Sequence, residues 1–224
     1  MNNRLQPLYE SLKSSNLDAF LNNEIELDEL WGKQIWGMFL IANLGEKVKA
    51  ILSEHQSQLE ELEPGIFSFP PPPAQHISIN QVVHCLGSYE LGNEKTWDSI
   101  KDSFLTSFKK LDQKYPKIDV TFSQLIATTG GIIWCAYDDD DEVENLRNEL
   151  FNELPFPEET TKKVHFIHTT VARYKNKLTN PQKVLDYIAN HQDKVSMTID
   201  KIVLRNELMF PSMNFKDIAE IDLK

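Results

Sequence analysis

The sequence predicts an α+β fold with largely antiparallel sheets. Two apolar segments rich in β-branched residues, 118–128 and 132–137, are joined at Thr129-Gly130-Gly131, a pattern typical of a hairpin. Amphipathic segments of medium helix length are interspersed with the strand-like segments instead of alternating regularly with them, which favours α+β over a parallel α/β arrangement. Two similar strand-like stretches, 92 residues apart, each carry a histidine followed two positions later by a hydroxyl residue.

Composition and charge narrow the class of protein. The chain has 224 residues, enough for one domain or a tight pair of lobes, with 41% hydrophobic and 25% charged residues. Its net charge of −11 disfavours an extended nucleic-acid footprint but allows a small nucleotide or a short RNA end in a cleft. No apolar run is long enough for a membrane helix, and the polar N-terminus shows no secretory signal. The two cysteines are expected to be buried free thiols, which suits a reducing cytoplasm. We predict a cytoplasmic protein that does not bind membranes and is a monomer.

In the first half of the chain, residues 1–35 form an N-terminal extension with one or two short surface helices. Leucines at positions 5, 8 and 12 have helical spacing, and an acidic segment follows. The elements expected next are a buried strand at 36–43, an amphipathic helix at 46–62, a strand at 76–86 and a helix at 97–110. Four consecutive prolines, 70–73, are expected to form a stiff polyproline II segment that leads into the strand at His76.

In the second half, the hairpin is followed by the acidic run 138–141 and a helix at 143–154. Carboxylates at that position favour the positive end of a helix, and a metal site is the less favoured alternative because no calcium-loop pattern follows. A strand is expected at 164–171 and a helix at 181–190, which starts at a proline. The closing strands are expected at 195–204 and 218–223.

The two histidine motifs are His76-Ile77-Ser78-Ile79 and His168-Thr169-Thr170-Val171. On a strand, positions i and i+2 share a face about 6.6 Å apart, so in each motif the imidazole and the hydroxyl project together. One such motif is usually a histidine beside a residue that simply favours strands. Two motifs in comparable contexts predict two related halves that contribute to a shared site.

Such a site has a definite chemistry. Two imidazoles provide an acid and a base that titrate near neutrality. The hydroxyls of Ser78 and Thr170 can donate hydrogen bonds to phosphate oxygens. This arrangement suits phosphodiester cleavage, including the opening of a cyclic phosphate, without a metal.

The sequence resembles the 2H phosphoesterase superfamily, the LigT-like and cyclic phosphodiesterase-like proteins with two H-x-[ST]-x motifs. Besides the motifs themselves, Met38–Ala42 with the helix after it is similar to the opening elements of the family. Phe69–Ile79 is similar to its approach to the first motif, and His168–Arg173 to its second motif. The resemblance spans residues 36–223, which are therefore expected to form one bilobal domain with two sheets around a central cleft and helices outside.

The resemblance implies a metal-independent phosphodiesterase that requires no cofactor. It would act on 2′,3′-cyclic phosphates, other small cyclic nucleotides or short oligonucleotide ends. His76 and His168 would be the acid–base pair, in an order that the sequence leaves open, and Ser78 and Thr170 would bind the phosphate. The alternatives are a nucleotide-binding module without turnover, and an interaction protein that uses the acidic extension and the proline run.

Further residues are candidates for substrate contacts. Arg173 follows the second motif, but strand parity places it opposite His168 unless a bulge intervenes, and Gln81 holds the same offset after the first motif. Phe166, Trp134 and Tyr137 are candidates for stacking on a base. The other histidines, at positions 55, 84, 165 and 191, are expected to be structural or solvated.

Overall fold

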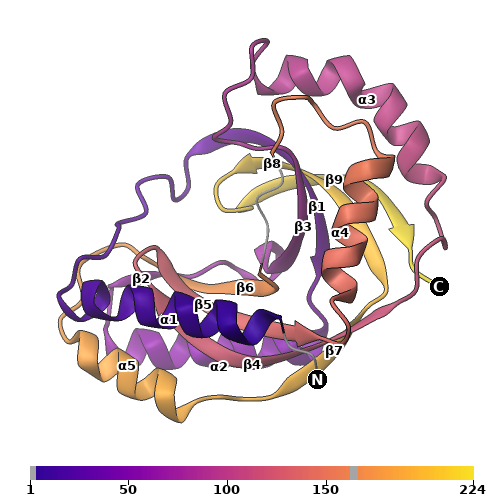
Figure 1. Ribbon diagram of the computed structural model, residues 1–224. Helices are drawn as coiled ribbons and strands as arrows, with labels where there is room; N and C mark the ends of the chain where they lie inside the picture. Colours follow the sequence, from indigo (N-terminus) through magenta and orange to yellow (C-terminus); the bar gives the residue numbers. More distant parts are fainter. Residues whose placement is uncertain (1–3, 162–165) are drawn as a thin grey trace.

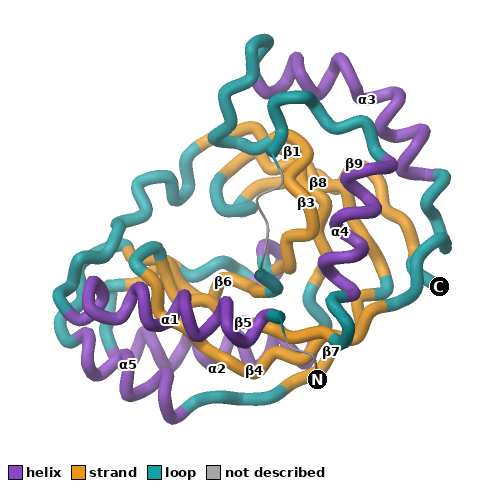
Figure 2. Tube along the Cα trace, in the orientation of Figure 1, coloured by secondary structure: helices purple, strands orange, loops and turns teal. Residues whose placement is uncertain are grey.

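Two antiparallel sheets, each in its own lobe, make up the framework (Figure 1). The computed structural model describes residues 4–161 and 166–224. The strand order is β3-β1-β8-β9 in the four-stranded sheet and β2-β6-β5-β4-β7 in the five-stranded sheet. Figure 2 shows the strands gathered into these two layers, with the helices outside and loops bridging the lobes. The predicted fold class, α+β with two mainly antiparallel sheets, is confirmed.

The elements have the following bounds. The helices are α1 (Leu5–Leu21), α2 (Glu46–Leu62), α3 (Asn93–Lys109), α4 (Glu142–Glu153) and α5 (Pro181–Asn190), and Pro72–Ala74 form a short 3₁₀ turn. The strands are β1 (Gln34–Asn43), β2 (Phe67–Ser68), β3 (His76–Val83), β4 (Ile118–Thr128), β5 (Gly131–Asp138), β6 (His168–Tyr174), β7 (Val195–Ile199), β8 (Lys201–Met209) and β9 (Asn214–Asp222). Within the described ranges, no helix combines the length and apolar character needed to cross a membrane.

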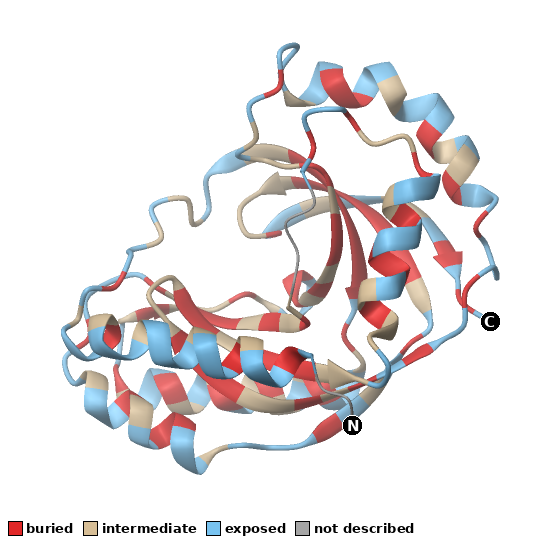
Figure 3. Ribbon diagram, in the orientation of Figure 1, coloured by how far each residue is buried: buried red, intermediate tan, exposed pale blue. Residues whose placement is uncertain are grey.

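The helices are shared between the lobes. Helices α3 and α4 pack on the four-stranded sheet, whereas α1, α2 and α5 pack on the five-stranded sheet. Figure 3 shows that the strands and the inward stripes of the helices are buried and that the outer helical faces are exposed. This is the pattern expected of amphipathic helices that cover one face of a sheet.

Several predicted elements differ from the structure; among them, the helix predicted at 97–110 begins at Asn93 and the strand predicted at 76–86 ends at Val83. The strand predicted at 195–204 is two strands in different sheets, because Ile199 pairs with Ile118 while Lys201 pairs with Asp222. The strand predicted at 164–171 begins at His168, and its positions 164 and 165 lie outside the described residues. The proline run is extended at Pro71 and then turns into the 3₁₀ helix. The strand predicted at 218–223 begins earlier, at Asn214.

The N-terminal segment is integrated into the five-stranded lobe. Its single helix, α1, buries Leu5, Tyr9 and Phe20 and lies across β4. The Tyr9 hydroxyl is 2.7 Å from the Ala136 carbonyl oxygen and 2.8 Å from that of Ile167, and it accepts a hydrogen bond from the Ile167 N–H. The helix thus satisfies backbone groups just before His168, where the second motif begins.

We expect Tyr9→Phe to lower the free energy of unfolding by about 1–3 kcal/mol, because the Ile167 N–H would stay buried without its acceptor. Urea denaturation measures the change. Tyr137→Phe is the matched control, since the Tyr137 hydroxyl is partly exposed and bonds side chains, Gln6 and Gln124. Equal effects of the two substitutions would contradict this role for Tyr9.

Candidate active site

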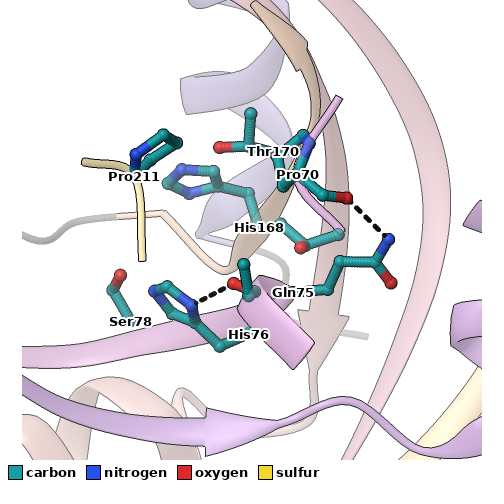
Figure 4. A pocket seen from close by; sticks show the side chains of 9 residues that line it. Pro70, Gln75, His76, Ser78, His168, Thr170 and Pro211 are labelled. Carbon is teal, nitrogen blue, oxygen red and sulfur yellow. Dashed lines mark hydrogen bonds between the residues drawn. The ribbon is translucent and has the colours of Figure 1, made fainter. Parts of the chain in front are cut away.

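The two motif strands approach each other where the sheets meet. Strand β3 is the edge of the four-stranded sheet and contacts β6 of the other. His76 and Ser78 on β3, and His168 and Thr170 on β6, line one pocket together with Pro211. Figure 4 shows both imidazoles turned into the same space, with the Ser78 hydroxyl on the His76 side and the Thr170 hydroxyl on the His168 side. The structure thus brings together the four residues that the two motifs nominate.

A wider cleft of about 430 Å³ extends from this pocket. The four motif residues are shared between the pocket and the cleft. The cleft is also lined by Phe166, Arg173 and Gln81. Around the turn between β8 and β9, its lining includes Glu207, Phe210 and Ser212. A cleft of this volume, with apolar walls and several convergent polar groups, is typical of small-molecule sites.

A bulge in β3 decides which side chains follow Ser78 into the cleft. Ser78 pairs with Ile41, but the next residue of β1, Leu40, pairs with Asn80, so one residue of β3 is extra. Asn80 therefore turns into the interior, where its amide donates to the Arg147 carbonyl. Gln81 takes the cleft face instead. Simple strand parity predicts that the side chains of His76, Ser78 and Asn80 share one face of β3. This prediction is wrong for Asn80.

The matching bulge lies in β6. Ile133 pairs with Thr170 whereas Ile132 pairs with Ala172, so β6 also has one extra residue directly after its motif. Arg173 consequently shares a face with His168 and Thr170, and it lines the cleft. Its Nε lies 3.5 Å from an Asp28 oxygen, and its guanidinium covers the Phe210 ring at 4.9 Å. The two motif strands place Gln81 and Arg173 equivalently, as their equal sequence offsets suggest.

Both catalytic candidates are neutral histidines in the free protein. The Nδ1 of His76 is 2.8 Å from the Ala74 carbonyl oxygen. Since a carbonyl only accepts, this nitrogen carries the proton and Nε2 is the basic atom. The pKa of His76 is lowered to about 4, mainly by burial. The hydrogen bond to the Ala74 carbonyl opposes this shift, and the positive charge of Arg205 contributes to it.

His168 has a similar environment. Burial lowers its pKa to about 4, and the positive charge of Arg147 acts in the same direction. The carbonyl of Phe166, again two residues before the histidine, opposes this shift. A bound phosphate would raise both pKa values, because a nearby negative charge favours the imidazolium.

Two of the sequence candidates for base stacking do not reach the cleft. Trp134 is fully buried and packs edge-on against His55 of α2, on the face of β5 opposite His168. Tyr137 lies three residues further along and so on the His168 face, but α1 covers it: its ring is 5.0 Å from that of Tyr9. Neither residue lines the cleft, and Tyr137 instead lines a separate pocket with Gln6 and Gln124. Phe166 does line the cleft, although it precedes β6.

Sequence reasoning missed several cleft residues. Glu207 lies near the end of β8, and Phe210 and Ser212 lie in the turn that follows it; this region carries no motif. Of the histidines expected to be structural or solvated, His84 lines the cleft, whereas His55 is buried and structural, with its Nδ1 2.8 Å from the Tyr187 hydroxyl. His165 lies outside the described residues. The one-residue bulge in each motif strand places Gln81 and Arg173 at the cleft, and no residue pattern in the sequence marks these bulges.

The acidic run 138–141 lies at the start of α4, where its side chains bind the backbone of the first turn and a neighbouring arginine. Asp138 accepts a hydrogen bond from the Val143 N–H at 2.6 Å, and Asp141 pairs with Arg4 at 2.9 Å. Among the described residues, no group of three His, Cys, Asp or Glu side chains is placed to hold a metal ion.

Comparisons with known proteins agree with this geometry. A family model described as the 2′-5′ RNA ligase superfamily matches residues 92–208, just over half of the chain. This matched segment includes the second motif. No curated protein matches the chain. The fold is similar to that of Escherichia coli LigT, solved in complex with 3′-AMP, with 9% identity, a TM-score of 0.53 and 86% and 99% of the two chains covered. It is also similar to TT0787 of Thermus thermophilus, with 14% identity, a TM-score of 0.52 and 84% and 97% covered.

We expect burial of the two histidines to make the protein less stable in acid. Their pKa of about 4 in the folded state lies below the unfolded value near 6.5, so the unfolded chain binds more protons between these pH values. Stability should therefore fall as the pH drops from 6.5 towards 4. Urea denaturation at several pH values should give a shallower fall for the double variant His76→Gln, His168→Gln. Identical slopes for the two proteins would contradict the shifted pKa values.

Proposed function

We propose that this protein is a metal-independent phosphodiesterase. The premise is that the chain belongs to the 2′-5′ RNA ligase superfamily, a group of two-histidine phosphoesterases. Its substrates would be 2′,3′-cyclic phosphates, other small cyclic nucleotides or short oligonucleotide ends. The observation that carries this proposal is the convergence of two imidazoles and two hydroxyls on one pocket.

The chemistry follows from these four groups. One neutral imidazole takes a proton from water, and the water oxygen forms a bond to phosphorus. The bond between phosphorus and the leaving ribose oxygen breaks, and that oxygen receives its proton from the other, protonated imidazole. The hydroxyls of Ser78 and Thr170 donate hydrogen bonds to the non-bridging oxygens, where negative charge accumulates. The product is a 2′- or 3′-phosphomonoester.

Cleft size and charge support a small substrate. The cleft volume of about 430 Å³ lies within the range of small-molecule sites. The net charge of −11 disfavours contact with a long phosphate backbone. Arg173 can contact a phosphate oxygen from the cleft wall, and Phe166 and Phe210 offer faces on which a base can stack. E. coli LigT, which shares the fold, was solved with 3′-AMP, and this makes 3′-nucleotide products a sensible first probe.

We expect His76→Ala and His168→Ala each to reduce kcat/KM by about 10²–10⁴-fold, because each removes one proton-transfer group. Ser78→Ala and Thr170→Val should cost about 10²-fold each through loss of a phosphate donor. The assay is hydrolysis of a panel of 2′,3′-cyclic mononucleotides, cyclic dinucleotides and short oligomers, followed by chromatography of the products.

His191→Ala is the control for these histidine variants, since His191 caps α5, stacks on Tyr187 and does not line the cleft. It should retain wild-type activity, and so should the wild type with excess EDTA. Full turnover in both single catalytic variants would refute the proposed mechanism. Tight binding of 3′-AMP without hydrolysis of any substrate in the panel would instead favour a nucleotide-binding module.

A further inference from the structure

The cleft contains a buried carboxylate that the proton transfers proposed above do not use. Glu207, near the end of β8, is 5% exposed and lines the cleft. Its Oε1 accepts a hydrogen bond from the backbone N–H of Ser212, in the turn that follows. A neutral amide oxygen could accept the same bond, so the turn by itself does not require a charge at this position.

The negative charge of Glu207 has no cation at ion-pair distance within the described ranges of the chain. Arg173 and Arg205 are the cations whose charges act on it. Each of them forms a closer ion pair elsewhere. Arg173 pairs with Asp28 at 3.5 Å, and Arg205 pairs with Asp217 at 2.7 Å. Burial raises the pKa of the Glu207 carboxyl, because its charged form is not fully compensated for the loss of water. A ligand that donates hydrogen bonds would supply this compensation.

Glu207 lies apart from the place where the phosphate would bind. It lines the wider cleft, whereas the pocket that holds both motifs has a different lining. A carboxylate repels a phosphate, so its presence disfavours any ligand that brings an anionic group to it. The interaction becomes favourable where the part of the substrate beyond the phosphate offers N–H groups. In a nucleotide, that part is the nucleoside.

The surroundings of Glu207 suit a planar aromatic group with a polar edge. Phe210, three residues further on, lines the cleft, and the guanidinium carbon of Arg173 lies 4.9 Å from the centre of its ring. Phe39, on the neighbouring strand β1, and Phe166, before β6, line the cleft as well. Phe39 belongs to a small apolar cluster that is separate from the main core. Aromatic faces of this kind stack on nucleobases, and stacking leaves the edge of the base available for hydrogen bonds.

Among the four RNA bases, guanine has the edge that fits a carboxylate. An ionised carboxylate only accepts hydrogen bonds, and its two oxygens can take two parallel donors. The Watson–Crick edge of guanine places N1–H beside the N2 amino group, so that two donors point the same way. In adenine and cytosine, the amino donor lies beside a ring nitrogen whose lone pair would face the second oxygen. In uracil, the single N–H lies between two carbonyls. These three edges therefore set electron pairs against the carboxylate, which discriminates against them.

We propose that Glu207 is a specificity-determining residue that accepts hydrogen bonds from N1–H and the N2 amino group of a guanine base, so that the preferred substrate carries guanosine at the scissile phosphate. This choice of substrate rests on the proposed phosphodiesterase function. The phosphate would lie at the two motifs and the base at Glu207, at two ends of one cleft. A two-pronged pair of this kind discriminates between bases by about 10–100-fold.

Calorimetric titration of the full chain with 3′-GMP, 3′-IMP, 3′-AMP, 3′-CMP and 3′-UMP tests the assignment without turnover. In the wild type, we expect Kd to be about tenfold or more higher for 3′-AMP than for 3′-GMP. The Kd of 3′-IMP, which keeps N1–H but lacks the N2 amino group, should lie between them. Glu207→Gln keeps an amide oxygen for the Ser212 N–H but removes the charge, and the preference for 3′-GMP over 3′-AMP should fall below about threefold. The matched control is Glu220→Gln on β9, an exposed carboxylate that pairs with Lys201, and it should keep the wild-type preference.

Equal affinities of the wild type for 3′-GMP and 3′-AMP would overturn the inference, and so would tighter binding of 3′-CMP or 3′-UMP. A purely structural role of Glu207 in the turn would lower the affinity of Glu207→Gln for every nucleotide by the same factor, and that result would overturn it too. Should this variant fail to fold, the order of the five nucleotides in the wild type decides.

The outcome also separates this inference from the proposed function. A protein that prefers 3′-GMP but hydrolyses no phosphodiester would refute the proposed function and support the role of Glu207. A protein that hydrolyses all four 2′,3′-cyclic mononucleotides with equal kcat/KM would refute the guanine preference and support the proposed function.

Discussion

Arg147 connects helix α4 to both motif strands through three backbone carbonyls, two on β3 and one just before β6. Removing this fork would leave those carbonyls, which lie in a buried to half-buried region, without this donor, a costly arrangement that the docked helix avoids. The separation of His76 and His168 is therefore set by a side chain outside both motifs. Asn80, turned inward by the bulge in β3, completes the link by donating to the Arg147 carbonyl.

The bulges show how far the sequence alone could lead. The imidazoles and hydroxyls of both motifs could be placed from strand parity, because parity holds over two residues. Beyond that it fails in both strands at the same point, and a bulge has no signature in the residues Ile79 and Val171. The same local uncertainty explains residues 195–204. Most positions on both sides of Asp200 suit a strand, but the change of partner sheet at Asp200 depends on pairing with β4 and β9, which are distant in sequence.

Packing of the N-terminal segment accounts for another limit. Tyr137 shares a face with His168, so a sequence argument can reasonably place it at the cleft. The structure sets α1 on that surface, with Tyr9 against the Tyr137 ring and Gln6 accepting from its hydroxyl. Local spacing predicts that a helix forms there but not where it docks. Arg147 was hidden for a similar reason, because an arginine in an amphipathic helix normally belongs to its solvated face.

Charge and burial together connect binding to catalysis. The chain carries a net charge of −11, yet Arg173 lines the cleft and the charges of Arg147 and Arg205 act on the motif histidines, each arginine with a carboxylate within 4 Å. Burial, helped by these cations, keeps both imidazoles neutral in the absence of an anion. A neutral ligand of the same shape would leave the proposed acid unprotonated, whereas a phosphate supplies the negative charge that holds the proton on it. The site would therefore discriminate in favour of phosphate substrates at the proton-transfer step as well as at binding.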